Sequence, residues 1–493
     1  PGTFTVEHIK LMSEEPIVFT LANPTPELFP EEVKAVRPKA IVGTGRSDFP
    51  NQVNNVLGFP FIFRGALDVR ATKINEEMKK AAVIALAELA KESVPEQVNI
   101  AYGETKLTFG RDYIIPKPFD PRLIAAVAPA VAKAAMESGV ALAPITDWEK
   151  YKDELLERMG NDNKMIRLLT NRARTNPKRI VFAEADQIDV LKAAQIVHEE
   201  GIGFPILLGN QEIIKELKAE IGFDVEAPIF DPKTEEAATR RHEFAAHFWE
   251  ARKRKGVTLY EAEKWMRERN YFGLMMVNTG EADAMVTGHS RSYPSTIKPV
   301  MQLIGKAPGV SKIATTNMMM TTRGPVFLSD TAINPNPTAQ ELARIALMTA
   351  KTVRMFGMEP VIAMVSFSNF GSSQSEGPNK VREAVAYLHE NFPDLIVDGE
   401  IQSDFALNPE LLKSKFPFSK LVNKKVNTLI FPNLDAANIT YKLLKELNKA
   451  DSIGPIILGL DKPVHVFLLG VCVVDLVILA AVAVVVALVI GKN

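Results

Sequence analysis

The sequence has almost no cysteine, since Cys472 is the only one among 493 residues. One cysteine excludes an internal disulfide and a metal site made of several thiolates, and it favours a reducing compartment. An excess of charge is missing as well, because 58 Lys and Arg are balanced by 59 Asp and Glu. Without a net positive field the chain is not expected to bind nucleic acid. The seven histidines are scattered, so we assign no metal site to them.

A signal segment is also missing, because no charged and then apolar stretch follows Pro1. We therefore expect a chain that begins inside a longer protein and works in the cytoplasm. One stretch, Val464 to Ile490, contains a single charged side chain, Asp475. About 20 apolar residues in a row would span a membrane. Gly470 and Asp475 interrupt the stretch, and a buried strand followed by a buried helix has the same composition, so we favour the soluble alternative.

The order of apolar runs predicts an α/β protein with more than one domain. Ile17–Ala22 and Lys39–Gly45 resemble buried parallel strands, and Ile74–Glu92 has helical spacing. A second series of alternating strands and helices begins at Lys178 and includes a long helical region, 235–278. Between the two series the strongly charged stretch 147–164 marks the main boundary.

Polar clusters follow the two predicted strands of the first part. They contain Asn23, Ser47 and Asp48, with Asn54 and Asn55 a few residues further on. In open α/β sheets, ligands bind outside the carboxyl ends of the strands. A carboxamide donates hydrogen bonds to a substrate carboxylate without adding charge. The alternative for each asparagine is a turn or a helix cap.

The motifs LANPTPE and TGRSDFPNQVNNVLGFPFIFRGALD are similar to the C-terminal part of the malic enzyme nucleotide-binding domain. The resemblance implies that Asn23 and Asn55 touch malate near the nicotinamide, and that Ser47 and Asp48 line the same cleft. The family's tyrosine–lysine pair, its acidic ligands for Mg or Mn and its glycine-rich turn precede these motifs. The resemblance therefore implies that this stretch alone does not oxidise malate, and that the cofactor is NADP or NAD.

The motifs ADAMVTG, FLSDTAINPNPTAQELA, SFSNFGSS, DGEIQSDFAL and LIFPNLDAANITYKLL resemble the phosphotransacetylase family, in family order. The combination of the two families resembles the large hybrid bacterial malic enzymes. It implies a partial dinucleotide-binding (Rossmann-like) domain, 1–146, a linker, 147–166, and a two-subdomain α/β domain, 167–493. Subdomain one would comprise 167–312 plus 455–493, and subdomain two 313–454.

The phosphotransacetylase resemblance also implies a site for acetyl-CoA and phosphate. Arg252 and Lys298 match basic positions near the phosphate, while Leu468 and Leu469 replace a serine and an arginine. Asp475 is retained as a candidate base. Loss of the hydroxyl and the guanidinium should cost several kcal/mol of transition-state stabilisation, or roughly three decades in rate. Weaker candidates at the ends of strands or in adjoining loops are His289, Arg291, Asp330, Asn336 and Ser372.

Three hypotheses follow. The leading one is a homo-oligomeric malic enzyme that converts malate to pyruvate and is regulated by acetyl-CoA bound to a domain without acetyltransferase activity. The second is an active phosphate acetyltransferase, which the Leu468–Leu469 pair disfavours. The third is a structural module that only holds subunits together.

Overall fold

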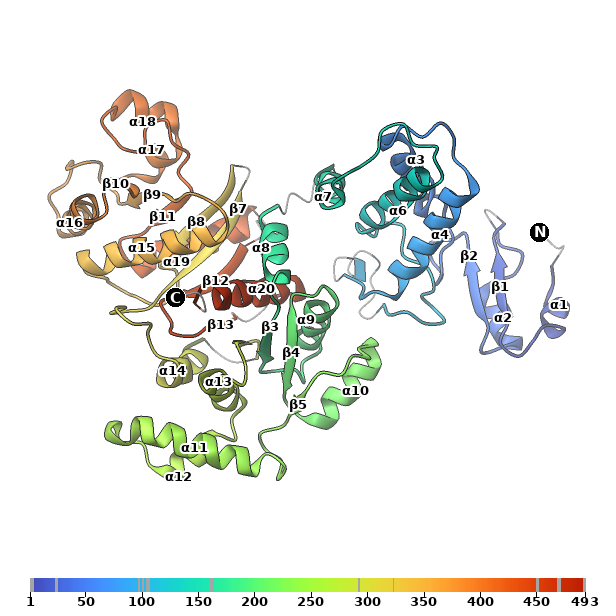
Figure 1. Ribbon diagram of the computed structural model, residues 1–493, viewed down its shortest axis with the longest axis horizontal. Helices are drawn as coiled ribbons and strands as arrows, with labels where there is room; N and C mark the ends of the chain where they lie inside the picture. The colour runs from blue at the N-terminus through green and yellow to red at the C-terminus, as the bar shows by residue number, and fades with distance from the viewer. Residues whose placement is uncertain are drawn as a thin grey trace. The chain divides into compact units, whose positions relative to one another are not determined.

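The computed structural model describes residues 4–22, 25–95, 98–99, 102, 107–158, 164–290, 293–321, 323–448, 452–467 and 471–490. It divides the chain into two compact units. One contains Pro1–Lys164 with Ala219–Phe223, and the other contains Met165–Lys218 with Asp224–Asn493. Both units combine helices with parallel strands (Figure 1), so the predicted α/β fold class is confirmed.

The first unit contains a small sheet and a group of helices. Its strands β1 (Ile17–Thr20) and β2 (Ile41–Thr44) pair in parallel. Its helices are α1 (Val6–Lys10), α2 (Pro30–Val36), the 3-10 turn η1 (Asn55–Leu57), α3 (Phe59–Asp68), α4 (Glu76–Lys91), α6 (Leu123–Glu137) and α7 (Trp148–Arg158).

Helix α6 is the centre of the helical core of this unit. Its residues Val127, Val131 and Ala135 recur at a spacing of four and are fully buried. Each buried valine contributes about 1.5–2 kcal/mol to the free energy of unfolding. Helix α3 approaches closely at Gly65, where an added Cβ would lie 2.4 Å from the carbonyl oxygen of Ala128. Glycine at this position therefore permits α3 and α6 to pack together.

The predicted linker 147–166 contains a packed helix. In α7, Tyr151 and Leu155 join the same hydrophobic core as α6, and the Tyr151 hydroxyl donates to Asp68 Oδ2 at 2.7 Å. The charged composition of this stretch reflects the exposed face of an amphipathic helix. Residues 159–163 lie outside the described part of the chain.

The first half of the second unit is organised around a five-stranded parallel sheet with the order β13-β6-β3-β4-β5. Its strands are β3 (Lys178–Phe182), β4 (Gly203–Leu208), β5 (Ile229–Phe230), β6 (Ala284–Thr287) and β13 (Val464–Val466). The helices of this half are α8 (Lys164–Arg174), α9 (Ile188–Glu199), α10 (Gln211–Ile221), α11 (Ala238–Arg252), α12 (Leu259–Trp265), α13 (Arg269–Thr279) and α14 (Tyr293–Leu303).

The predicted helical region 235–278 is three helices joined by two breaks. Helix α11 ends at Arg252 and a 3-10 turn, η2 (Lys253–Lys255), follows it. Gly256 then adopts a left-handed conformation with φ 85°, which glycine reaches without steric cost. Thr258 begins α12 through a capping box with Glu261.

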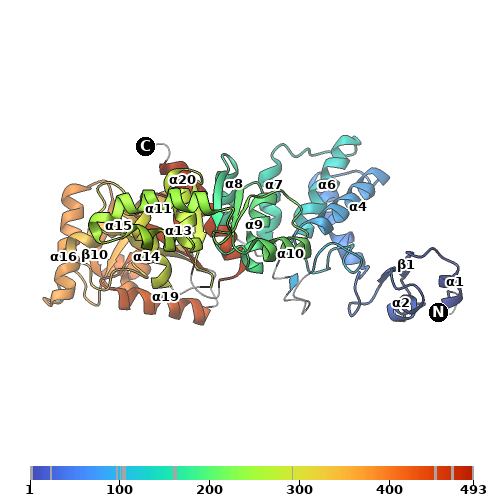
Figure 2. The same cartoon turned by 90° about the horizontal axis from the view of Figure 1, so that it is seen from below.

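The second half contains a six-stranded mixed sheet with the order β10-β9-β11-β8-β7-β12. Its strands are β7 (Ala314–Thr321), β8 (Gly324–Ser329), β9 (Val361–Val365), β10 (Ile396–Ile401), β11 (Thr428–Ile430) and β12 (Ser452–Leu458). Its helices are α15 (Ala339–Met355), α16 (Glu376–Asn391), α17 (Ser403–Leu407), α18 (Pro409–Lys415) and α19 (Leu434–Asn448). Figure 2 shows α16 beside β10.

One strand lies in a different sheet from the one predicted. The predicted boundary at 455 assigns the strand GPIILGL to subdomain one, but β12 pairs antiparallel with β7 in the six-stranded sheet. The chain then crosses to the five-stranded sheet, where β13 pairs in parallel with β6. An apolar pattern predicts a strand but does not specify which of the two sheets the strand joins. The backbone hydrogen bonds of the strand are satisfied equally at the edge of either sheet.

The apolar C-terminal stretch forms helix α20 (Val473–Ile490), with a mean hydropathy of 3.2. By length and composition alone it is the one helix of the described residues that could cross a membrane. In this fold it packs against α9, β3, β6 and β12, and 61% of the helix is buried. Helix α20 is apolar on nearly all sides because other parts of the protein cover most of its surface, as expected of a core helix.

Candidate functional site

In the first unit the loop after β2 presents a pair of opposite charges. The Arg46 guanidinium donates to both oxygens of Asp48, with distances of 2.8 and 2.6 Å. These bonds lower the pKa of the Asp48 carboxyl below its ordinary value. Ser47 lies between the two residues and is exposed. Asn23 lies outside the described residues.

The asparagines of the following loop divide into structural and exposed ones. Asn54 caps η1, because its Oδ1 accepts from the Val56 N–H at 3.0 Å. Asn51, which the sequence analysis did not single out, is buried and bonds to Val42, Arg111 and Ile114. Asn55 is exposed on η1. Of these three side chains, that of Asn55 is therefore the best placed to meet a ligand.

In the second unit a buried carboxylate organises the turn after β6. Glu184 accepts from the backbone N–H groups of Gly288 (3.0 Å), His289 (2.6 Å) and Ser290 (3.3 Å), and from the Ser290 hydroxyl at 2.6 Å. Gly288 has φ 107°, a conformation that favours glycine. Glu184 was missed as a site residue. Its signal in the sequence is an acid at the end of the apolar run KRIVFAEA.

Two buried polar atoms lie on the segment that this turn positions. His289 Nδ1 and the Tyr293 hydroxyl are inaccessible, and neither has a hydrogen-bond partner in the described structure. His289 Nε2 lies 3.8 Å from Asp189 Oδ2. Burial, and then the nearby Asp330 carboxylate, raises the pKa of Tyr293. Arg291, between these two side chains in sequence, is outside the described residues.

Asp330 holds its own loop together. Its buried carboxylate accepts from the Thr315 N–H and hydroxyl, at 2.9 and 2.6 Å, and from the backbone and side-chain N–H groups of Asn334. It also accepts from the N–H groups of Ala332 and Ile333. The geometry therefore supports a role in shaping the loop between β8 and α15. Asn336 lies further along this loop, is exposed, and accepts from Lys380 Nζ at 2.6 Å.

A second buried carboxylate, Glu400, organises the small-residue loop after β9. It accepts from Gly371 N–H (2.7 Å), the Ser368 hydroxyl (3.1 Å) and the Arg382 guanidinium (3.2 Å). Burial alone would raise the pKa of Glu400, but the bonds from Arg382 and Gly371 outweigh it and the pKa is lowered. The hydroxyl of Ser372 lies 2.9 Å from that of Ser368. Glu400 and Arg382 were both missed by the sequence analysis.

The remaining predicted residues are dispersed over the second unit. Arg252 is the last residue of α11. Burial raises the pKa of the Tyr271 hydroxyl, and the positive charge of Arg252 partly offsets this rise. Lys298 is exposed on α14. Asp475 lies in the first turn of α20. Leu468, Leu469 and Gly470 lie outside the described residues.

A family model for phosphate acetyl/butaryl transferases matches residues 164–484, which is more than half of the chain. The chain belongs to the phosphate acetyl/butaryl transferase family. A second model, for the NAD binding domain of malic enzymes, matches residues 1–103. Both predicted resemblances are therefore confirmed, and the transferase-family region contains the two carboxylate-organised turns.

Known relatives resemble one or both parts. The chain is 45% identical over 467 residues to an NADP-dependent malic enzyme from Haemophilus influenzae, covering 94% of this chain and 62% of that protein. It is 40% identical over 310 residues to a phosphate acetyltransferase from Thermoanaerobacterium thermosaccharolyticum, covering 61% of this chain and 92% of that protein. A phosphotransacetylase structure from Streptococcus pyogenes is 36% identical with a TM-score of 0.62, covering 66% of this chain and 99% of that one. The chain thus spans about 62% of the malic enzyme relative and nearly all of the transferase relatives.

The metal implied by the malic enzyme resemblance has no ligand set in the described ranges. No group of three or more His, Cys, Asp or Glu side chains there is arranged to hold an ion. Asp48 is the acid nearest in sequence to the loop that contains Asn54 and Asn55, and it is paired with Arg46. In the first unit, the described candidates Ser47 and Asn55 are exposed polar groups.

Proposed function

We propose that the chain is part of an NADP-dependent malic enzyme that oxidises and decarboxylates malate to pyruvate. Its second unit binds acetyl-CoA as an effector and does not transfer the acetyl group. The 45% identity to an NADP-dependent malic enzyme supports the first statement. The transferase family match, together with leucine at positions 468 and 469, supports the second. The cytoplasmic location and the homo-oligomer remain predictions.

The observation that carries the effector proposal is the pair of unpartnered atoms after β6. A buried polar atom without a hydrogen bond costs about 1–3 kcal/mol. His289 Nδ1 and the Tyr293 hydroxyl are two such atoms on one short segment. The amide groups of the pantetheine arm of coenzyme A contain both donors and acceptors, and would satisfy these atoms once a movement of the segment exposed them. The turn held by Glu184 fixes the start of this segment in advance, which reduces the entropy lost on binding.

Calorimetric titration of the chain with acetyl-CoA tests this proposal. We expect saturable binding, weakened about tenfold by Tyr293→Phe, since loss of one good hydrogen bond is worth about 1.4 kcal/mol. Tyr260→Phe is the matched control, because Tyr260 is exposed on α12. No saturable binding by the unaltered chain would disprove the effector proposal. Equal affinities for both variants would exclude Tyr293 from the site.

Regulation requires the effector to bind two conformations of the enzyme with different affinity. Acetyl-CoA should therefore depress malate oxidation by the full-length protein. The Tyr293→Phe variant should need about tenfold more acetyl-CoA for the same effect. An unchanged rate at saturating acetyl-CoA would show that binding, if present, is not regulatory.

In the first unit, Asn55 is the described asparagine proposed to contact malate. We expect Asn55→Ala in the full-length enzyme to raise KM for malate about tenfold, through loss of a bond to a charged carboxylate. Because Asn55 is exposed, the unfolding temperature should not change. An unchanged KM would remove Asn55 from the malate site.

A second candidate function is acetyl transfer from acetyl-CoA to phosphate. It is favoured by the match over 92% of a phosphate acetyltransferase. The two functions differ in one assay, formation of acetyl phosphate from acetyl-CoA and phosphate by the chain. Our proposal predicts no product above a blank reaction, and robust turnover would favour the transferase. If acetyl phosphate forms, Asp475→Asn tests whether Asp475 is the catalytic base, because this variant should abolish any turnover that depends on it.

A further inference from the structure

A separate pocket lies at the carboxyl end of β5, at the edge of the five-stranded sheet. Its volume is about 460 Å³, within the range of about 300–1,000 Å³ that small-molecule sites occupy. The walls come from the end of β5, the loop after it, the start of α10 and the start of α11. Ligands of open α/β sheets bind outside the carboxyl ends of the strands, and this pocket has that position. It contains none of the residues assigned to the acetyl-CoA site.

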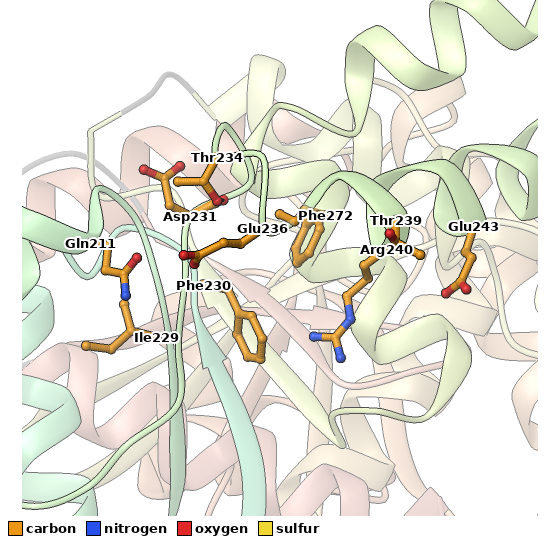
Figure 3. Close-up of a pocket in the computed structure, with 11 residues that line it drawn as sticks. Gln211, Ile229, Phe230, Asp231, Thr234, Glu236, Thr239, Arg240, Glu243 and Phe272 are labelled. Carbon is orange, nitrogen blue, oxygen red and sulfur yellow. The ribbon is translucent and has the colours of Figure 1, made fainter.

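The pocket contains a cation–π pair made by Arg240 and Phe230. The Arg240 guanidinium carbon lies 4.9 Å from the centre of the Phe230 ring. Figure 3 shows the Arg240 side chain reaching back from α11 towards this ring. An aromatic ring that has a guanidinium over one face can stack on a second planar group with its other face. A flat heterocyclic ring would therefore extend the stack.

The loop that forms one wall is fixed before any ligand binds. Arg241 is 8% exposed, and its Nη1 donates to the carbonyl oxygens of Pro232, at 2.9 Å, and Thr234. Asp231 accepts from the Lys233 N–H at 2.9 Å within the same loop. A charged donor that holds two carbonyls gives the wall a defined shape, which reduces the entropy cost of binding.

The charges of the pocket disfavour phosphate and favour a ligand with donor groups. Three carboxylates line it, from Asp231, Glu236 and Glu243, against the single guanidinium of Arg240. Arg240 Nε also lies 3.6 Å from Glu281 Oε2, so part of its charge is already neutralised. A phosphate group would be repelled, whereas ligand hydroxyl and amino groups would donate to the carboxylates.

Together, these features identify the kind of ligand. We propose that the pocket binds a purine nucleoside without phosphate, with its ring stacked on the face of Phe230 that Arg240 leaves free (Figure 3) and its ribose hydroxyls donating to Glu236. In Figure 3, Glu236 and Gln211 lie on the other side of Phe230 from Arg240. The Gln211 carboxamide has both a donor and an acceptor for the ring or the sugar. The site is independent of the proposed acetyl-CoA site, because it lies in a different loop set and disfavours the phosphates of coenzyme A.

Calorimetric titration of the complete chain with adenosine tests this proposal. We expect saturable binding, with adenosine monophosphate bound about tenfold more weakly because of the carboxylates. Arg240→Ala, which removes the cation held over Phe230, and Glu236→Ala should each weaken adenosine binding about tenfold. The matched controls are Arg254→Ala and Glu235→Ala. Arg254 is exposed beyond the end of α11, and neither control residue lines the pocket, so both should bind as the unaltered chain does.

Several outcomes would overturn the proposal. They are no saturable binding of adenosine, equal losses in the pocket and control variants, or tighter binding of the monophosphate than of adenosine. A competition experiment with acetyl-CoA distinguishes this pocket from the proposed acetyl-CoA site. Saturating acetyl-CoA should leave the adenosine affinity of the chain unchanged, and competitive displacement would assign the pocket to coenzyme A instead.

Discussion

The sheets of the two units differ in how completely they are covered. In the first unit, Ile17 and Phe19 of β1 and the following Leu21 are 58%, 52% and 48% exposed, all on one face. In the second unit the strands β6 and β9 are buried throughout, because helices or loops cover both faces. The transferase-like unit therefore contains its own core. The malic enzyme-like sheet presents apolar surface that its own residues do not cover.

The largest expected effect is that of a charge placed in α20, which tests whether the core of the second unit is fully covered. Val482 is fully buried, so Val482→Asp should destabilise the second unit by more than about 4 kcal/mol, since the carboxylate has no partner there. Chemical denaturation followed by circular dichroism measures this loss. If α20 functioned instead as a membrane span, the unaltered chain would need detergent to stay in a high-speed supernatant.

The next largest loss of stability should come from the turn after β6, which the Glu184 carboxylate holds. Glu184→Ala leaves three backbone N–H groups without their acceptor and should cost about 3 kcal/mol. It should also weaken acetyl-CoA binding, because His289 and Tyr293 follow this turn. The control is Glu199→Ala, because Glu199 is exposed at the end of helix α9 and accepts a side-chain bond from Gln195 but none of the three turn N–H groups. Equal unfolding free energies for the two variants would contradict the role of Glu184.

A pH-dependent effect should follow from His465, a buried residue of β13 whose Nδ1 accepts from the Ile457 N–H of β12 at 3.4 Å. Burial lowers the pKa of His465 to about 4, whereas in the unfolded chain it is about 6.5. The unfolded state therefore binds a proton first as the pH falls. The stability of the second unit should be complete above pH 6.5 and decrease by up to roughly 3 kcal/mol towards pH 4.

Replacement of the histidine isolates this contribution. His465→Leu should remove that part of the pH dependence, while His247→Gln, on the exposed face of α11, should leave it intact. Denaturant titrations at several pH values between 4 and 7 measure both. Identical pH profiles for the unaltered chain and His465→Leu would show that other groups control acid sensitivity.

The smallest effect is expected on the open face of the first unit. Phe19→Ser should change the free energy of unfolding by less than about 0.5 kcal/mol, as is usual for exposed positions. It should reduce self-association, which light scattering measures, because an apolar patch is removed. A loss of several kcal/mol would mean that this face is covered in solution, and would remove the contrast between the units.

Sequence patterns predicted elements better than they predicted contacts. The expected helix Ile74–Glu92 corresponds closely to α4, because Asn75 caps it and its apolar spacing is regular. The predicted site residues were chosen by type and position, and several form structural bonds instead. Asn54 caps a turn, and Asp330 bonds to Thr315 of β7 and to Asn334 of its own loop. Conversely, Glu184 and Glu400 are far in sequence from the residues they hold, and no local pattern connects them.

Hydrophobic spacing, motif order and cysteine number are properties of the chain, and they were enough to predict the α/β class, the two families and the absence of an internal disulfide. The three-dimensional fold was needed to show that β12 joins the six-stranded sheet, and that α20 is a core helix. It also decided that Arg240 and Phe230 form one wall of a pocket. The physical reason is that strand pairing, burial and charge balance depend on which distant segments meet. A linear pattern specifies which surfaces need a partner, but not which partner covers them.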